Sequence, residues 1–216
     1  MSSEQCGNDA LWSGAVKLGG SLLNWPKMPS RLAELLTTSP RQRPLLIVGG
    51  GSAANIVREW HRAHAFDDDT AHALAIDAMT LNSRFLATLL PGTEIVTDHG
   101  QAVEAWATDR WPILDCRTFL AAQEPLQALK LPHSWQATSD TIAGWIARTW
   151  PASSLTLVKS VDLPTDHSPT AVSAAGLVDE YLATWIDQLP ATDWVNLRSA
   201  TPQPVRWYPQ GNQPVP

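Results

Sequence analysis

The sequence predicts an α/β fold, a three-layer α/β/α sandwich with a mainly parallel central sheet. Short apolar segments alternate with helical patterns along nearly the whole chain, which favours parallel strands with helices on both faces. Residues 45–48 form a continuous apolar run, as expected for a strand buried on both faces. Glycine clusters at 19–20 and 49–51 directly follow predicted strands, at the edge where ligands of such sheets bind.

The predicted elements follow from apolar spacing and from the residues that interrupt it. The strands are short apolar runs, at 15–18, 45–48, 94–97, 112–115, 155–159 and 194–197. The helices have apolar residues at helical spacing, at 29–37, 53–63, 71–90, 101–107, 118–122, 139–150 and 177–189. We expect Ser30 to cap the first helix. The second helix is expected to turn Ile56, Val57 and Trp60 inward, and residues 161–175 are predicted to form a long loop.

Composition excludes several classes of function. The 216 residues carry a net charge of −6, with 44% hydrophobic and 17% charged residues, which suits a domain with a buried core. The negative charge argues against a general nucleic-acid binder, whereas a small anion needs only local N–H groups and one or two lysines. Cys6 and Cys116 are far apart and form neither a disulfide framework nor a paired-cysteine zinc motif.

We expect one domain over residues 14–200, between a flexible extension over 1–13 and a proline-rich, irregular tail over 201–216. The N-terminus lacks the apolar core of a signal peptide, and no run approaches the ~20 apolar residues of a membrane span. The sequence therefore predicts a cytoplasmic protein with no membrane partner. The eleven tryptophans are expected mainly in the core, and the alternative is that one stacks on a flat ring of a ligand.

The glycine clusters indicate phosphate binding. A strand that ends in glycine and leads into a helix directs backbone N–H groups at an anion. Neither cluster matches the Walker phosphate loop, which disfavours that class of ATPase. Gly49, Gly51 and Ala54 fit a relaxed dinucleotide-binding pattern, with acidic residues at 67–69 downstream. An NAD-dependent oxidoreductase therefore remains an alternative, although the spacing to these acids is short.

Two charged residues are candidates for catalysis. Lys17 lies just before the first glycine cluster, where an ammonium could stabilise charge on a transferring phosphoryl group. Asp140 lies in the first turn of a predicted helix, where a carboxylate could orient lysines. The alternatives are a solvated lysine at a strand end and an ordinary capping aspartate.

A group of histidines and acids is a weaker candidate. His61 and His64 are three residues apart on one predicted helix, with acids at 67–69 and His72 nearby, so a divalent metal is conceivable. We interpret the group instead as a solvated helix end followed by an acidic cap, because no motif fixes a ligand geometry. We therefore assign no metal site.

An ordered set of motifs resembles the amino acid kinase superfamily, which includes acetylglutamate, aspartate and uridylate kinases. The motifs are Val16–Ser21, the glycines at 49–51, the helix opening Ser139–Ala143, and the strand from Leu155 that leads into Lys159–Asp162. The segments at 72–79 and 131–140 resemble one small branch of the superfamily, which phosphorylates an (aminomethyl)furanylmethyl phosphate with ATP. The resemblance covers roughly residues 14–198.

The resemblance implies roles for residues of this chain. Lys17 would contact the transferring phosphoryl group, and Asp140 would orient it. The residues that would hold the nucleotide are Gly19, Gly20, Ser21, Lys159 and Asp162. Those that would line the acceptor side are Gly49, Gly50 and Gly51. ATP would bring Mg²⁺ with it, held mostly by phosphate oxygens, and the chain would form a homo-oligomer, as superfamily members usually do.

The chain departs from the superfamily pattern near its nucleotide loop. Leu163–Pro164 follows Asp162 where most members carry glycine, and residues 165–176 contain neither lysine nor arginine where many members carry a second lysine. Lys159 could supply that cation. The sequence thus predicts an ATP-dependent kinase for a small, phosphorylated acceptor. The alternatives are a non-catalytic nucleotide- or oxyanion-binding protein on the same fold, and a uridylate or acylamino-acid type of kinase.

Overall fold

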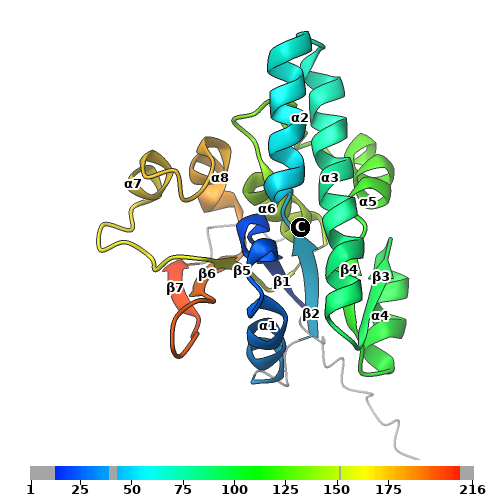
Figure 1. Ribbon diagram of the computed structural model, residues 1–216, viewed down its shortest axis with the longest axis vertical. Coiled ribbons are helices and arrows are strands. Elements are labelled where there is room, and N and C mark those ends of the chain that lie inside the picture. Colours follow the sequence, from blue (N-terminus) through cyan, green and yellow to red (C-terminus); the bar gives the residue numbers. More distant parts are fainter. Residues whose placement is uncertain (1–12, 39–42, 151, 210–216) are drawn as a thin grey trace, which may run out of the picture.

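A seven-stranded sheet forms the centre of the computed structural model, which describes residues 13–38, 43–150 and 152–209 (Figure 1). The strands are β1 (Ser13–Leu18), β2 (Arg43–Val48), β3 (Thr93–Val96), β4 (Trp111–Leu114), β5 (Ser154–Lys159), β6 (Ala191–Asn196) and β7 (Val205–Tyr208). Their order across the sheet is β3-β4-β2-β1-β5-β6-β7, and only β7 is antiparallel to its neighbour. The predicted α/β fold with a mainly parallel sheet is confirmed.

Helices connect the parallel strands. The α-helices are α1 (Met28–Thr37), α2 (Gly51–His64), α3 (Asp68–Leu89), α4 (His99–Ala107), α5 (Cys116–Gln123), α6 (Ser139–Thr149), α7 (Pro169–Ala174) and α8 (Glu180–Trp185). Short 3₁₀ helices are η1 (Gly20–Asn24), η2 (Glu124–Leu126) and η3 (Ile186–Gln188). Five of these α-helices begin with a capping side chain that accepts a hydrogen bond from the backbone N–H three residues later. The capping residues are Asp67, Asp98, Asp115, Ser168 and Asp179.

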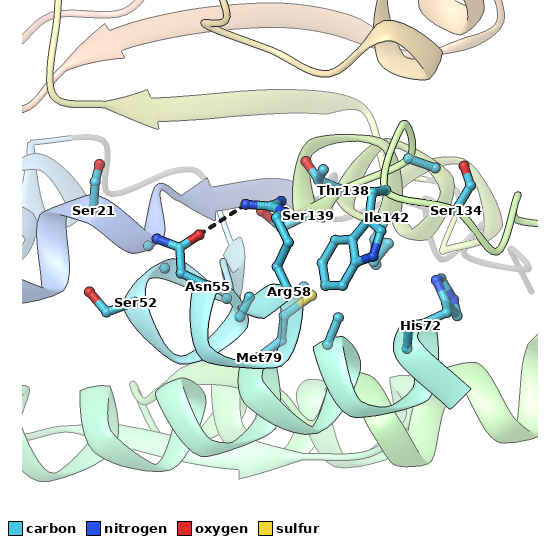
Figure 2. Close-up of a pocket in the computed structure, with 18 of the residues that line it drawn as sticks. Ser21, Ser52, Asn55, Arg58, His72, Met79, Ser134, Thr138, Ser139 and Ile142 are labelled. Atoms are coloured by element: carbon cyan, nitrogen blue, oxygen red, sulfur yellow. Dashed lines mark hydrogen bonds between the residues drawn. The ribbon is translucent and has the colours of Figure 1, made fainter. Parts of the chain in front are cut away.

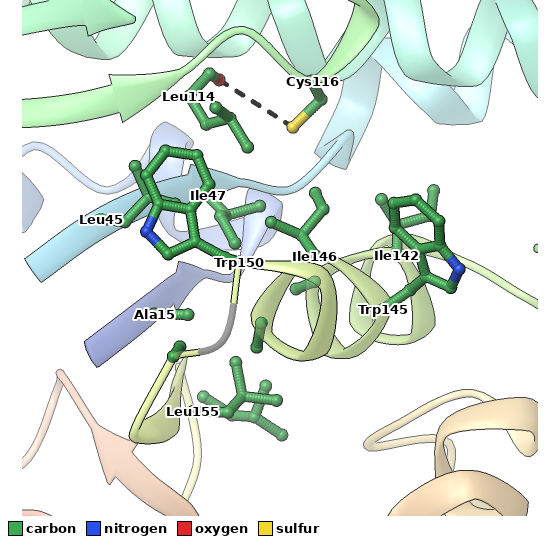
Figure 3. Packing of buried hydrophobic residues seen from close by; sticks show 14 of the residues in the cluster. Ala15, Leu45, Ile47, Leu114, Cys116, Ile142, Trp145, Ile146, Trp150 and Leu155 are labelled. Carbon is green, nitrogen blue, oxygen red and sulfur yellow. Dashed lines mark hydrogen bonds between the residues drawn. The ribbon is translucent and has the colours of Figure 1, made fainter. Parts of the chain in front are cut away.

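The alternation of side chains along each strand produces a separate core on each face of the sheet. On one face Ala15, Leu45 and Ile47 pack against α6 and the residue that follows it, where Ile142, Trp145, Ile146 and Trp150 are buried (Figure 3). On the other face the even-numbered residues of β1 and β2 pack against the leucines of α1 and the end of α3. The cores explain why strand segments as short as four residues remain in the sheet.

Helix α2 differs from its prediction. Val57 is buried, but Ile56 and Trp60 are 47% and 52% exposed. Figure 1 shows that α2 and the start of α3 extend beyond the sheet, and α2 packs chiefly on α3 and η1. Because α3 and η1 cover only a narrow side of α2, part of the apolar face of this helix is exposed to solvent.

Two elements were missed by the sequence analysis. The predicted loop 161–175 contains α7, whose start at Ser168-Pro169 has the cap and first-turn proline typical of a helix N-terminus. The predicted irregular tail contains β7, which pairs with β6. Of the predicted extension 1–13, Ser13 is the first residue of β1, and residues 1–12 lie outside the described residues. Within the described ranges, no helix has the length and apolarity needed to cross a membrane.

Candidate active site

The register of the sheet brings two lysines to the same face. Lys17 on β1 aligns with Leu157 on the parallel neighbour β5, so Lys159 lies two residues farther along the same face. This is the face covered by α6, whose first turn contains Asp140. The two lysines lie near the carboxyl ends of their strands, and the helix places a carboxylate between them.

Lys17, Asp140 and Lys159 form a buried charged triad. The Lys17 Nζ donates to Asp140 Oδ1 at 2.6 Å, and the Lys159 Nζ donates to Oδ1 and Oδ2 at 2.9 and 2.8 Å. Lys159 also donates to the carbonyl oxygen of Leu177 at 2.6 Å. The side chains of Lys17 and Asp140 are only 4% and 8% exposed. The alternatives of a solvated lysine and an ordinary capping aspartate are therefore excluded.

Burial and pairing have opposite effects on these groups. Burial alone would raise the pKa of Asp140, but Lys159 and Lys17 lower it to about 2, so the carboxylate is ionised at neutral pH. Burial lowers the pKa of Lys159 to about 8, even though Asp140 opposes this shift. With both lysines protonated, the triad carries one excess positive charge.

Asp179, which no sequence motif indicated, fixes the start of α6. Its carboxylate accepts from the N–H and hydroxyl groups of both Thr138 and Thr141, with three of these four contacts at 2.8–3.0 Å. It also caps α8 by accepting from the Leu182 N–H at 2.9 Å. Thr138, the N-cap residue of α6, makes no capping hydrogen bond with its own side chain. The sequence predicts that the last helix begins at residue 177, whereas Asp179 is the N-cap residue of α8.

The two glycine turns touch each other. A Cβ atom on Gly20 would lie 2.2 Å from the Gly51 nitrogen, and one on Gly51 would lie 2.6 Å from the Gly20 oxygen. Gly51 also has a φ of +49°, in the left-handed region that favours glycine. Only two residues without side chains allow this contact, which joins the start of η1 to the start of α2.

Asn82, also missed, holds the second glycine turn. Its buried Nδ2 donates to the carbonyl oxygens of Gly49 and Gly50 at 2.7 and 2.8 Å. Asn82 thus binds the carbonyl groups of the turn, which leads directly into α2. The N-terminus of that helix has no side-chain cap. The first glycine turn likewise leads into η1 without a side-chain cap. Their N–H groups therefore remain available to an anion.

A pocket of about 480 Å³ lies beside the glycine turns (Figure 2). Ser21, Ser52 and Asn55 lie at one end, and His72 and Ser134 lie at the other. Between them is Arg58, whose guanidinium donates to Asn55 Oδ1 at 3.0 Å and lies 4.6 Å from the centre of the Trp135 ring. The size suits a small organic molecule, and the two ends differ in chemistry.

The histidines of the conceivable metal group make other contacts. His61 Nδ1 accepts from the Trp135 Nε1 at 2.8 Å, and its Nε2 lies 3.7 Å from Asp68 Oδ1. His64 is exposed at the end of α2, whereas His72 is buried. Over the described ranges, no three His, Cys, Asp or Glu side chains are arranged to hold a metal ion.

Comparisons with known proteins point to one group. No protein-family model matches the chain. The chain is 25% identical over 156 residues to the [5-(aminomethyl)furan-3-yl]methyl phosphate kinase of Methanocaldococcus jannaschii, covering 71% of this chain and 68% of that protein. The structure resembles the UMP kinase of Ureaplasma parvum, with a TM-score of 0.60 and 14% identity over 88% of this chain and 92% of that one.

The uridylate kinase of Archaeoglobus fulgidus has a similar structure, with a TM-score of 0.53 and 16% identity over 84% of this chain and 89% of that one. Together these findings confirm the predicted resemblance to the amino acid kinase superfamily. The relatives in sequence and in structure are kinases, which supports the predicted class of enzyme, an ATP-dependent kinase.

The structure places the residues predicted from the superfamily resemblance in three groups. Lys17, Asp140 and Lys159 meet in the triad, where both lysines contact the Asp140 carboxylate. Gly20, Ser21, Gly50 and Gly51 line the pocket, while Gly19 and Gly49 support it through backbone hydrogen bonds to Val158 and Leu18. Asp162 stands apart, where its Oδ1 accepts from Asn196 at 2.9 Å.

Proposed function

We propose that the chain catalyses ATP-dependent phosphoryl transfer to a small phosphorylated acceptor, with an (aminomethyl)furanylmethyl phosphate as the first candidate. The triad supports this proposal most directly, since two buried lysines share the Asp140 carboxylate, and Ser139, the chain neighbour of Asp140, lines a pocket edged by the uncapped start of α2. The name of the Methanocaldococcus jannaschii relative supports the choice of acceptor.

The chemistry of the triad favours an acceptor that is already anionic. Asp140 is bound by both lysines and its pKa is about 2, so it is a poor proton acceptor at neutral pH. A phosphate monoester needs no general base, because its second pKa is about 6 and an oxygen is ionised at neutral pH. The site would act by positioning and by stabilising charge, as is usual for phosphoryl transfer.

We assign the triad to the transferring phosphoryl group, with the glycine turns on either side. Lys17 and Lys159 would stabilise the charge that develops during transfer, and Asp140 would hold both ammonium groups in position. The first glycine turn with Ser21 would bind the nucleotide phosphates, and Gly50 and Gly51 would bind the acceptor phosphate.

Magnesium is part of this proposal as a companion of ATP. Mg²⁺ prefers oxygen ligands and keeps several waters, so nucleotide phosphates can hold it with few protein ligands. The uncapped N–H groups and the excess positive charge of the triad suit the phosphate groups of such a complex. When bound, the ion would neutralise part of the triphosphate charge.

The proposal is tested by replacing Lys17 with methionine, which keeps the length of the side chain and removes its charge. We expect kcat for phosphoryl transfer from ATP to fall by about 10²- to 10³-fold, as when one transition-state donor is removed elsewhere. Lys27→Met is the matched control, because Lys27 is exposed at the start of α1. Phosphoryl transfer is measured by coupled assay with [5-(aminomethyl)furan-3-yl]methyl phosphate and with UMP.

Two results would contradict the proposal. One is an unchanged kcat in Lys17→Met. The other is ATP binding by the wild-type chain without transfer to any phosphate tested, which would favour the non-catalytic alternative. Transfer to UMP in preference to the furan phosphate would keep the kinase and replace the acceptor.

A further inference from the structure

Two buried polar atoms at the far end of the pocket have no partner. His72 Nε2 and Ser134 Oγ are inaccessible to solvent and make no hydrogen bond within the described part of the chain. Both residues line the pocket, at the end away from Ser21, Ser52 and Asn55 (Figure 2). Buried polar atoms usually have hydrogen-bond partners, so two unpartnered atoms on residues that line one cavity point to a ligand that would supply the missing partner. His72 is only 8% exposed.

His72 is built to be neutral and rigid. Its ring stacks on that of His133, with centroids 4.1 Å apart and an angle of 14° between the planes. Burial lowers the pKa of His72 to about 4, and the neighbouring His133 contributes to this shift. A neutral imidazole can offer a lone pair, and the Ser134 hydroxyl oxygen offers a second acceptor.

The charges around this end of the pocket are mainly negative. His133 lies between Asp69 and Glu124, with its Nδ1 2.7 Å from Asp69 Oδ1 and its Nε2 3.3 Å from Glu124 Oε1. Asp68 lines the pocket itself. Two carboxylates thus flank His133, and Arg117, which also acts on His72, is paired with Asp77 at 3.7 Å. This field favours a cation and opposes a second anion.

The opposite end of the pocket has the reverse character. Arg58 lies toward that end, and the start of α2 leaves N–H groups without a side-chain cap. The pocket therefore accommodates an anionic group at one end and a hydrogen-bond donor with positive charge at the other. An ammonium group has three donors and no acceptor, which suits two acceptor atoms in a negative field.

We infer that His72 and Ser134 form the subsite that recognises a protonated amine on the acceptor, at the end remote from its phosphate. This inference rests on the proposed function, because both ends belong to the same acceptor pocket. His72 Nε2 and Ser134 Oγ accept from the ammonium, and His133 holds the His72 ring in place by stacking. The two residues determine which phosphates bind and take no part in the transfer itself.

The inference is tested with three phosphates that differ at one position. The probes are [5-(aminomethyl)furan-3-yl]methyl phosphate, its 5-hydroxymethyl analogue and its 5-methyl analogue, titrated calorimetrically and assayed with ATP and Mg²⁺. We expect the wild-type chain to bind the amine about 10- to 100-fold more tightly than the methyl compound, in line with a charge-assisted hydrogen bond. The hydroxymethyl compound is expected between them.

Two variants locate the discrimination. Ser134→Ala removes one acceptor, and His72→Phe removes the other while it keeps a ring to stack on His133. Each is expected to weaken binding of the amine about 10-fold or more and to leave binding of the methyl compound unchanged. His64→Ala is the matched control, since His64 is exposed at the end of α2 and does not line the pocket. Thermal melting without ligand shows whether each variant is folded.

The outcomes separate this inference from the proposed function. Equal affinity of the wild-type chain for the amine and either analogue overturns the inference alone, as does an equal loss for all three phosphates in both variants. The wild-type chain could bind the amine more tightly than the methyl compound, lose this preference in Ser134→Ala, and yet transfer no phosphoryl group. That result supports the inference and overturns the proposed function. Failure of the wild-type chain to bind the amine overturns the inference, and transfer to UMP in the same assay would then keep the kinase with another acceptor.

Discussion

At the scale of single residues, one carboxylate organises the charges of the candidate active site. Asp140 contacts both lysines, so removing either lysine leaves the aspartate with one partner. A buried charge without any partner is costly, whereas a fully paired set is tolerated in a protein interior. The excess positive charge depends on Lys159 remaining protonated, and this residue has the lowered pKa.

The activity is expected to fall as pH rises through about 8, because Lys159 loses its charge there. Lys159→Arg should have a lower kcat and should lose this alkaline decline, since arginine stays protonated. The pH profile of kcat for both proteins checks this, with Lys27→Arg as the control. An unchanged alkaline decline in Lys159→Arg would assign the decline to another group.

The same shift has the opposite effect on stability. Between pH 8 and the ordinary lysine value of 10.5, the unfolded chain binds more protons at this site than the folded chain. The contribution of Lys159 to the free energy of unfolding therefore rises with pH in this range. Loss of activity above pH 8 is thus expected without unfolding caused by this group, and melting curves at each pH separate the two.

At the scale of elements, the contact between the glycine turns joins the two halves of the proposed binding site. The start of η1 lies against the start of α2, and Asn82 from α3 holds the second turn from behind. Neither turn can move away without breaking contacts to the other. The donor and acceptor sides are therefore held at a fixed separation by backbone atoms.

Gly20→Ala is expected to weaken ATP binding strongly, because a Cβ atom 2.2 Å from the Gly51 nitrogen forces the turns apart. The free energy of unfolding should fall by about 1–3 kcal/mol, as for other overpacked sites. Gly92→Ala is the matched control: Gly92 has a φ of +85° but nothing within 4 Å of its added Cβ. It should cost about 1–2 kcal/mol through backbone strain and leave ATP binding unchanged.

Calorimetric titration of ATP and urea unfolding of both variants check this prediction. Similar losses of stability with different effects on ATP binding would support the proposed role of the turns. ATP affinity in Gly20→Ala equal to that of the wild-type chain would show that this contact does not shape the nucleotide site.

At the scale of the whole molecule, the antiparallel strand β7 completes one edge of the sheet. Trp207 is 4% exposed, and its ring meets that of Trp194 edge to face at 5.9 Å. Its Nε1 donates to the His167 carbonyl oxygen at 2.8 Å, which ties β7 to the loop before α7. The strand therefore supports both the core and the segment that follows Lys159.

Trp207→Ala is expected to lower the free energy of unfolding by about 3–5 kcal/mol, because it leaves a large cavity and an unpaired carbonyl. Trp60→Ala should change it by less than about 0.5 kcal/mol, since Trp60 is 52% exposed. Urea unfolding curves compare the two. Similar midpoints for both variants would mean that β7 contributes little to the fold.

The parts of the molecule that follow local rules were predictable. Apolar runs and glycine clusters predicted the parallel strands and the turns after β1 and β2, and the motif resemblance predicted Lys17 and Asp140. Asp179 and Asn82 were not predictable, because their partners lie 38 to 41 and 32 to 33 residues away in the sequence. Strand β7 was missed because prolines at its ends resemble a loop, which is common for an edge strand.

The register of β1 and β5 limits how this chain can vary. Losing or gaining one residue within either strand would turn its lysine to the opposite face of the sheet, away from Asp140. The loop that begins after Lys159 is under no such restriction, because its length does not alter the position of the strand before it. Leu163 and Pro164 lie in this loop. Evolution can therefore rebuild the segment beyond β5 repeatedly while the three charges keep their geometry.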